Sequence, residues 1–261
     1  MDPLRPLTAD PARAALFFDV DGTLAPIVQR AQDAQVPKET SLRLAALSRR
    51  YACVACISGR AATDVRRLVG VGGIAYAGSH GAELLEPNAS RARIAPEFAR
   101  FEPEVKAFVH ERDTPDLRRL RVRIEDKGPI MTYHWRGAPD EDAARERVEE
   151  LGAEAEAEGL WTHWGRKVLE IRPPVPVDKG QAVRELLDLR PARAALYAGD
   201  DVTDLDAFAA LEELAGDGAL DTAVRVGVRS DEGPAEIAER ADLVVDGVEG
   251  MQAVLAELEP S

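Results

Sequence analysis

Two aspartates one residue apart, Asp19 and Asp21, directly follow an apolar segment at residues 14–18. The apolar segment predicts a buried β-strand, and Gly22 predicts a turn immediately after the two acids. In open α/β folds, ligands bind beyond the carboxyl ends of the strands, and this order places both carboxylates there. Charges crowded at such a position favour a hard divalent cation, which prefers oxygen ligands. The alternative interpretation is a solvated acidic turn after a core strand.

Three further segments bring polar side chains to the predicted ends of secondary-structure elements. The apolar segment Cys53–Ile57 predicts a second strand, and a serine, a glycine and an arginine follow it at residues 58–60. Lys179 lies at the start of a helical segment. A third apolar segment, residues 194–198, is followed by acidic residues, which are Asp200, Asp201 and Asp204. Together these polar groups can hold one metal ion and one phosphate.

The four segments resemble the motifs of the haloacid dehalogenase-like phosphohydrolases. Those motifs are Asp-x-Asp-x-Thr, then Ser or Thr, then Lys, then Gly-Asp-x-x-x-Asp, and they occur here in that order between Asp19 and Asp204. Any one of them alone is weak evidence, because a short motif counts only in its structural context. Four of them at predicted element ends, in the right order, are strong evidence.

The resemblance implies a chemical role for each polar group. Asp19 would attack phosphorus and form an aspartyl-phosphate, while Asp21 would protonate the leaving oxygen and later deprotonate the attacking water. Mg²⁺ would be held by Asp19, by Asp200 and by the main-chain carbonyl of Asp21. Ser58 and neighbouring backbone N–H groups would bind the phosphate oxygens, and Lys179 would balance their charge.

The two remaining acids of the last motif are expected to act behind the metal ligands. By the same resemblance, Asp201 and Asp204 would orient metal-bound water and the backbone of their loop. The alternative for both is capping of the N-terminus of the following helix, which we expect for Asp204. The two roles are compatible.

Length and charge limit the functional classes. The chain has 261 residues, enough for one large or two modest domains, and a formal net charge of −14. No basic stripe offsets this charge, so we expect no nucleic-acid partner. No apolar run approaches the roughly 20 residues of a membrane helix, and the first 13 residues lack the apolar region of a signal peptide. We therefore expect a cytoplasmic enzyme without a membrane partner.

Two other motifs suggest cofactor sites, but their context favours structural roles. Cys53 and Cys56 form a Cys-x-x-Cys pattern that is typical of redox or zinc sites. Both lie within a predicted strand, where positions three apart point to opposite faces, so we interpret them as small core residues. The glycine cluster at residues 70–73 follows a helical pattern and precedes a strand, the reverse of a dinucleotide-binding motif. It predicts a helix end and a turn.

The element pattern predicts two domains. Helical segments at 38–50 and 61–69 alternate with the strands already named, which predicts an α/β fold with a Rossmann-like parallel sheet and helices on both faces. From about residue 96 to residue 174 the pattern changes to helix, strand, strand, helix, strand, strand. The expected domains are a haloacid dehalogenase-like hydrolase core, residues 1–97 and 175–261, and an inserted α+β cap, residues 98–174.

The predicted cap strands, at residues 121–127, 130–136 and 167–172, show period-two alternation. An antiparallel sheet with this pattern has one apolar face and one charged face. Apolar residues at helical spacing predict a helix that covers the apolar face; they are Ala144, Val148, Leu151 and Ala155. The charged face is either solvent-exposed or a recognition surface for a polyhydroxyl ligand.

Longer motifs make the resemblance more specific. Residues 19–27, 78–83, 125–128, 134–136, 168–173 and 199–204 together resemble the trehalose-6-phosphate phosphatases. That family binds the glucose hydroxyls with a Glu and a Lys two residues apart and a further Glu on a later cap strand. In this chain these are Glu125, Lys127 and Glu170. Leu205 departs from the acidic residue typical of its position, which weakens the outer metal environment.

The resemblance implies a further group of substrate contacts beside Ser58. Gly59 and Arg60 follow it directly, and both are expected to touch the substrate. His80 either caps a turn or touches the sugar. The implied reaction is magnesium-dependent hydrolysis of trehalose 6-phosphate, with trehalose-6-phosphate synthase as a functional partner.

Two alternatives stay open. The first is a phosphatase for another sugar phosphate, such as sucrose phosphate or mannosyl-phosphoglycerate. The second is a non-catalytic regulatory module that serves a trehalose synthase. Degenerate modules usually lose a nucleophile or a metal carboxylate. We favour the enzyme because Asp19, Asp21, Lys179 and Asp200 are all present.

Overall fold

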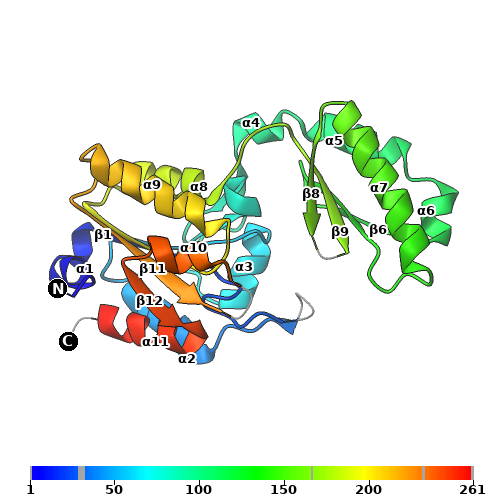
Figure 1. Cartoon of the computed structure of the whole chain (residues 1–261). Coiled ribbons are helices and arrows are strands. Elements are labelled where there is room, and N and C mark those ends of the chain that lie inside the picture. The colour runs from blue at the N-terminus through cyan, green and yellow to red at the C-terminus, as the bar shows by residue number, and fades with distance from the viewer. Residues whose placement is uncertain (1, 29–32, 166, 231–232, 260–261) are drawn as a thin grey trace. The chain divides into compact units, whose positions relative to one another are not determined.

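A computed structural model describes residues 2–28, 33–165, 167–230 and 233–259 (Figure 1). The chain divides into two compact units, which are residues 1–93 with 177–261, and residues 94–176. Among the described residues, no helix combines the length and the apolar composition that crossing a bilayer requires.

The larger sheet lies in the first unit, apart from Ile94 at the end of its edge strand. Its strands are β1 (Ala14–Phe18), β2 (Cys53–Ile57), β3 (Ala75–Gly78), β4 (Glu83–Leu85), β5 (Arg93–Ile94), β10 (Ala194–Gly199), β11 (Thr222–Arg229) and β12 (Leu243–Asp246). Within the described residues their order is β12-β11-β10-β1-β2-β3-β4-β5. The pairs from β12 to β3 are parallel, and β4 joins β3 in antiparallel orientation. The expected parallel sheet is confirmed.

The strand order reverses between β1 and β10. From β1 the chain continues outward through β2 and β3, whereas β10, β11 and β12 extend on the other side. Phe18 at the end of β1 pairs with Cys56 and with Ala198, and the next backbone N–H, that of Asp19, donates to the Ala198 carbonyl at 2.8 Å. Such a topological switch point is where open α/β sheets bind ligands.

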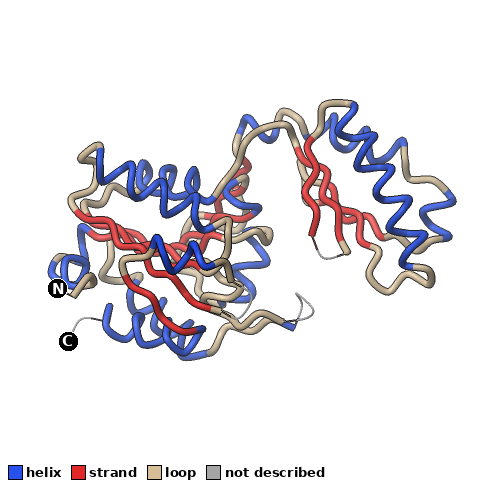
Figure 2. The backbone as a smooth tube through the Cα atoms, in the orientation of Figure 1, coloured by secondary structure: helices blue, strands red, loops and turns tan. Residues whose placement is uncertain are grey.

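Helices cover both faces of this sheet (Figures 1 and 2). One face carries α1 (Arg5–Ala9), α2 (Lys38–Leu47), α3 (Ala62–Val69) and α11 (Gly247–Leu258). The other carries α8 (Lys179–Leu189), α9 (Asp204–Gly216) and α10 (Ala235–Arg240). Because side chains alternate along a strand, Leu16 and Phe18 pack into the first core and Phe17 into the second. Short 3₁₀ turns, η1 (Pro11–Arg13) and η3 (Ser79–Gly81), precede β1 and follow β3.

The two motifs that suggested cofactors are structural, as predicted. Cys53 and Cys56 are both buried and free, and they pack into the cores on opposite faces of the sheet. Gly70 ends α3 in the left-handed conformation, with φ of 73°. That backbone conformation is one that glycine adopts without steric cost.

The second unit contains a four-stranded antiparallel sheet with helices on one face. Its elements are α4 (Pro96–Ala99), α5 (Glu102–Glu111), α6 (Pro115–Arg119), β6 (Arg123–Asp126), β7 (Met131–His134), α7 (Glu141–Ala157), β8 (Trp161–Gly165) and β9 (Val168–Arg172). The strand order is β6-β7-β9-β8. Three helices, rather than the single helix expected, precede β6. A proline at the first or second position starts each of them, because proline fits a helix start but not a helix interior.

The sheet of the second unit has one apolar face, as predicted. Alternate residues of β7 and β9, among them Tyr133 and Leu169, are fully buried. They pack against the four apolar residues of α7 that recur at helical spacing, which are Ala144, Val148, Leu151 and Ala155.

Candidate active site

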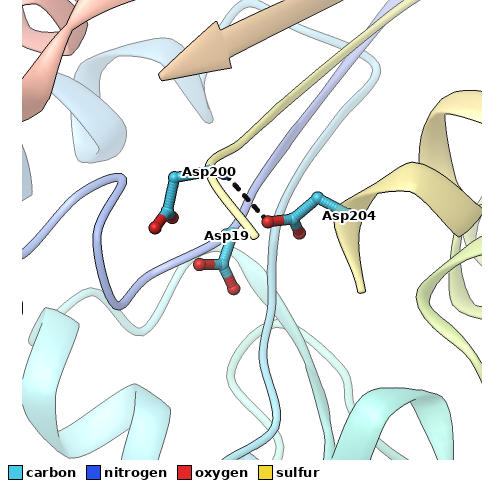
Figure 3. Close-up of side chains that lie close together, drawn as sticks. All are labelled: Asp19, Asp200 and Asp204. Atoms are coloured by element: carbon cyan, nitrogen blue, oxygen red, sulfur yellow. Dashed lines mark hydrogen bonds between the residues drawn. The ribbon is translucent and has the colours of Figure 1, made fainter. Parts of the chain in front are cut away.

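Three carboxylates meet at the switch point. Asp19 follows β1, Asp200 follows β10, and Asp204 is the first residue of α9. One oxygen of each lies within 4.8 Å of the others, and all three residues are at most 4% exposed (Figure 3). Carboxylates held so close together in a buried site repel one another unless positive charge is present.

One lysine supplies part of that charge. Lys179, the first residue of α8, is buried, and its Nζ donates to Asp19 Oδ1 at 2.8 Å and to Asp204 Oδ1 at 2.6 Å. Burial alone would lower the pKa of Lys179, but Asp19 and Asp204 raise it above its ordinary value. The lysine is therefore charged, and a single ammonium group faces three carboxylates.

The Asp204 carboxylate is fully occupied by the protein. Its Oδ1 accepts from Lys179 and, at 2.6 Å, from the hydroxyl of Tyr197. Its Oδ2 accepts from the backbone N–H groups of Asp200 and Asp201, each at 2.9 Å. A carboxylate has about four acceptor sites, and all of them are used here. Asp204 thus holds the loop between β10 and α9 and has no lone pair left for a cation.

These contacts correct the expectation that Asp204 caps the N-terminus of α9. The N-cap residue is Thr203, and its side chain makes no capping hydrogen bond. Asp204 lies inside the helix, and its carboxylate turns back to the loop before it. It accepts there from the N–H groups of Asp200 and Asp201.

Asp19 and Asp200 keep one oxygen each for a ligand. Thr23 donates to Asp200 Oδ1 at 2.8 Å, and Lys179 donates to Asp19 Oδ1. The second oxygen of each carboxylate accepts no hydrogen bond from the part of the chain that the structure describes. Burial and neighbouring Asp204 raise the pKa of Asp200 to about 7. Burial also raises the pKa of Asp19 well above its ordinary value, against the opposing effect of Lys179. A cation beside the two open oxygens would offset the burial of these carboxylates, so the donor set fits a divalent cation.

A glycine allows the turn that approaches Asp200. Gly22 has φ of 96°, and a Cβ atom there would lie 1.9 Å from Asp200 Oδ2. The turn is closed by the N–H groups of Leu24 and Ala25, which both donate to the Val20 carbonyl. Any side chain at residue 22 would displace the Asp200 carboxylate.

The second acid of the Asp-x-Asp motif lies outside the buried cluster. The Asp21 side chain is 35% exposed, and both of its oxygens accept hydrogen bonds from Arg60, each at 2.6 Å. The hydrogen bond to Asp21 is the largest cause of the raised pKa of Arg60. Two residues that the sequence assigned to separate roles are thus partners.

Ser58 starts the loop after β2, one strand away from Asp19. It is buried, its N–H donates to the Ala77 carbonyl at 2.9 Å, and its Oγ accepts from the N–H of Arg60 at 3.2 Å. His80 lies against this loop. Its N–H donates to the Ser58 carbonyl, and a Cβ atom at Gly59 would lie 2.7 Å from its Nε2.

The three predicted sugar-binding residues lie together on the polar face of the second unit. Lys127 Nζ is 3.2 Å from Glu170 Oε1 and 3.8 Å from Glu125 Oε2. Glu170 also accepts from Arg172. Burial would raise the pKa of Glu170, but Arg172 and Lys127 lower it below its ordinary value, so this carboxylate is ionised.

Comparison with known proteins identifies the family. The sequence profile described as Trehalose-phosphatase matches residues 17–246. The chain belongs to the trehalose-phosphatase family. This is a family of phosphatases, enzymes that hydrolyse phosphoric monoesters.

The relatives agree with this assignment. A trehalose-phosphate phosphatase of Mycobacterium marinum is 39% identical over 214 residues, which cover 76% of this chain and 52% of that protein. The chain therefore spans about half the length of this relative. A solved structure titled as a trehalose-6-phosphate phosphatase related protein is 25% identical, covers 94% of this chain and 96% of its own, and has a TM-score of 0.69. The C-terminal domain of the Candida albicans trehalose-6-phosphate phosphatase shares the fold, with a TM-score of 0.68, 23% identity and coverage of 98% and 96%.

Three residues that support the site gave no distinct signal in the sequence. Tyr197 looked like one more residue of an apolar strand, and Thr23 was only part of a quoted motif. Glu83 is buried, and it accepts from Ser79 Oγ at 2.8 Å and from the N–H of Ala62 at 3.0 Å. Glu83 thereby links the turn that contains His80 to the first residue of α3. Glu83 was only the last residue of the motif at 78–83, and its position directly before two leucines was the available signal.

Proposed function

We propose that the chain is a magnesium-dependent phosphatase that hydrolyses trehalose 6-phosphate to trehalose and phosphate through an aspartyl-phosphate. The observation that carries the proposal is the buried group of Asp19, Lys179 and Asp200 at the switch point. It presents one open oxygen on each carboxylate, and the single charge of Lys179 does not balance the three carboxylates gathered there. Membership of the trehalose-phosphatase family supports the substrate.

Asp19 is the nucleophile of the proposed reaction. Lys179 orients the carboxylate through Oδ1, one carboxylate oxygen attacks phosphorus, and the bond from phosphorus to the sugar oxygen breaks. Asp19, Asp200 and the carbonyl of Asp21 would hold Mg²⁺, which supplies charge neutralisation for the phosphate when it is bound. Ser58 and the backbone of Gly59 bind the phosphate oxygens.

Asp21 moves the protons. It protonates the oxygen that leaves with trehalose, and then takes a proton from the water that cleaves the aspartyl-phosphate. Both of its oxygens face Arg60 in this structure, so the pair has to open before Asp21 reaches the leaving oxygen. Substrate phosphate is a suitable competitor, because a guanidinium group binds phosphate as well as carboxylate in a bidentate way.

Asp201 and Asp204 support the loop that carries Asp200. Asp204 fixes the loop that carries Asp200, and Asp201 accepts from the N–H of Val202 at 2.6 Å within the same loop. Their effect on the reaction is therefore to hold Asp200 in position.

The first unit acts as the hydrolase core in this proposal, and the second as its cap. Glu125, Lys127 and Glu170 bind the glucose hydroxyls, because the face that carries them offers donors and acceptors side by side. His80 and Arg60 contribute contacts on the core side. A cytoplasmic location and a trehalose-6-phosphate synthase partner belong to the same proposal.

Phosphate release from a panel of substrates tests the function. The panel contains trehalose 6-phosphate, sucrose 6-phosphate, mannosyl-phosphoglycerate, glucose 6-phosphate and an aryl phosphate, each with Mg²⁺. We expect trehalose 6-phosphate to give the highest kcat/KM. A higher kcat/KM for another sugar phosphate would identify that compound as the substrate. The absence of turnover for every compound in the panel would favour the regulatory module.

A further inference from the structure

The polar face of the second unit extends beyond the three predicted sugar-binding residues. Strand register places Glu125 opposite Thr132, Thr132 opposite Glu170, and Glu170 opposite His163. Residues directly opposite in antiparallel strands point to the same face. One row of side chains therefore crosses all four strands and reaches the edge strand β8.

A tryptophan extends this face along β8. Trp161 pairs with Arg172, which shares its face with Glu170. The neighbouring positions of β8 point the other way, because Trp164 lies over Gly152 of α7, where a Cβ atom would be 2.8 Å from its ring. The Trp161 side chain is 47% exposed, and its neighbours on the face are charged or polar.

The centre of the row contains an unsatisfied group. The hydroxyl of Thr132 is fully buried between the strands of Glu125 and Glu170, and it has no hydrogen-bond partner among the described residues. Buried hydroxyls are normally paired. The row therefore stays polar at its centre, and the ionised Glu170 with Lys127 and Arg172 makes the face suited to a ligand with several hydroxyls.

A sugar ring matches the combination of polar row and tryptophan. A pyranose has hydroxyls around its edge and C–H groups on its flat faces, so it needs charged or polar partners and one flat apolar surface. Trp161 offers that surface, and indole rings combine an apolar body with tolerance of water. Burial and Arg172 lower the pKa of His163, so its imidazole is neutral near pH 7, with one ring nitrogen a donor and the other an acceptor.

We propose that Trp161 and His163, with Glu170 and Arg172, form a sugar-ring subsite on β8. One glucose ring of the substrate stacks on Trp161, and its hydroxyls bind the other three side chains. The subsite rests on the proposed function, because the ring is one of the two rings of trehalose 6-phosphate. It would make β8 a determinant of disaccharide specificity.

The same strand provides a matched control. Trp164 is 44% exposed, close to the value for Trp161, but it lies on the opposite face, with its ring centroid 6.3 Å from that of Trp135 in an edge-to-face contact. Single exposed aromatic residues are common on protein surfaces. A comparison of the two tryptophans separates a binding role from mere exposure.

The test uses the full chain and two readouts. In the first, kcat and KM are measured for trehalose 6-phosphate and an aryl phosphate in wild type, Trp161→Ala, Trp161→Phe and Trp164→Phe. We expect Trp161→Ala to raise KM for trehalose 6-phosphate about tenfold with little change in kcat, and to leave the aryl phosphate unaffected. Trp161→Phe should recover most of the loss, and Trp164→Phe should match wild type. An unchanged KM in a folded Trp161→Ala variant would overturn the subsite.

The second readout does not depend on turnover. Titration of trehalose should change the tryptophan fluorescence of wild type and Trp164→Phe but not that of Trp161→Phe. A response retained in Trp161→Phe contradicts the subsite even if the enzyme is active. A wild type that responds to trehalose but hydrolyses no trehalose 6-phosphate supports the subsite and rejects the proposed function.

Discussion

Both carboxylate oxygens of Asp21 accept hydrogen bonds from a single guanidinium group, that of Arg60, at 2.6 Å each. In the proposed mechanism, the pair joins the residue that moves protons to the loop that binds phosphate. Arg60 thereby fixes the direction of the Asp21 side chain in the free protein. If substrate phosphate replaces Asp21 as the partner of Arg60, phosphate binding is coupled to the release of Asp21.

We therefore expect Arg60→Lys to lower kcat/KM by about 10–100-fold, because an ammonium group cannot make the two parallel hydrogen bonds. Arg225, in the first half of β11, and Asp242, just before β12, form a similar two-bond pair, at 2.9 and 3.0 Å. Arg225→Lys is the matched control, and steady-state kinetics with trehalose 6-phosphate give the comparison. Equal activity of the two lysine variants would contradict a role of Arg60 in the reaction.

Asp19→Asn should abolish turnover, by roughly three orders of magnitude or more, because the amide is a poor nucleophile. The fold should persist, since Lys179 keeps its contact with Asp204. Mass spectrometry of acid-quenched wild type should find phosphate on Asp19. Activity of Asp19→Asn near the wild-type level would exclude the covalent mechanism.

Removal of metal should make stability depend on pH through Asp200. Its pKa is raised from 3.8 to about 7 in the folded protein, so the folded state binds the proton more tightly than the unfolded state. The resulting stabilisation is complete below pH 3.8 and is lost as the pH rises through about 7. We expect the Tm of metal-free protein to fall between pH 5 and pH 8, and Mg²⁺ to raise Tm more at pH 8.

Asp200→Asn provides the control for this prediction. The variant should lose most of the fall in Tm and most of the response to Mg²⁺, because the amide does not titrate and is a weaker ligand. Thermal unfolding with and without a chelator measures both effects. A wild-type response to Mg²⁺ in Asp200→Asn would place the cation elsewhere.

Tyr197 supports the loop between β10 and α9, which would bind the metal in the proposed function. Tyr197→Phe removes only the hydroxyl that donates to Asp204 and keeps the edge-to-face contact with Phe208, whose ring centroid is 6.1 Å away. We expect kcat to fall about fivefold to twentyfold with little change in KM, because Asp200 loses part of its support.

The buried tyrosine of β3 gives a matched control for the expected fall in kcat of Tyr197→Phe. Tyr76 donates its hydroxyl to the Val71 carbonyl, remote from the acidic cluster. Tyr76→Phe should lose a similar amount of thermal stability and keep kcat. Equal kcat for the two phenylalanine variants would show that the Tyr197 hydroxyl serves stability alone.

Truncation of the polar face of the second unit should separate substrate recognition from chemistry. Glu125→Ala, Lys127→Ala and Glu170→Ala should each lower kcat/KM for trehalose 6-phosphate by about tenfold or more, since each loses paired hydrogen bonds worth roughly 1–3 kcal/mol. Hydrolysis of an aryl phosphate should change much less. Asp21→Ala should depress both substrates. If each of the three variants lost activity on trehalose 6-phosphate and on the aryl phosphate to the same extent, the face would serve the stability of the second unit instead of substrate recognition.

The sequence was most informative where polar side chains directly follow short apolar segments, because those positions are the ends of strands. Asp19, Lys179 and Asp200 could be placed together because parallel strands end at one edge, and short apolar segments before each acid marked those ends. The apolar stripe of α7 and the faces of β7 and β9 followed from periodicity alone.

Features that depend on contacts between distant residues were beyond sequence reasoning. The pairing of Arg60 with Asp21 and of Tyr197 with Asp204 depends on three-dimensional distances that periodicity does not encode. Ser79 and His80 adopt positive φ, 50° and 58°, although neither is glycine. Such backbone strain is tolerated only where surrounding contacts enforce it, and here Glu83 accepts from Ser79.

The central position of β1 has a consequence for the chain as it leaves the ribosome. One edge of β1 pairs with β2 soon after synthesis, but the other needs β10, which follows the entire second unit. A fully buried apolar strand with an open edge is a template for pairing with other chains. We therefore expect nascent chains that stall before β10 to aggregate or bind chaperones, and this vulnerability to end once β10 has emerged and closed the edge.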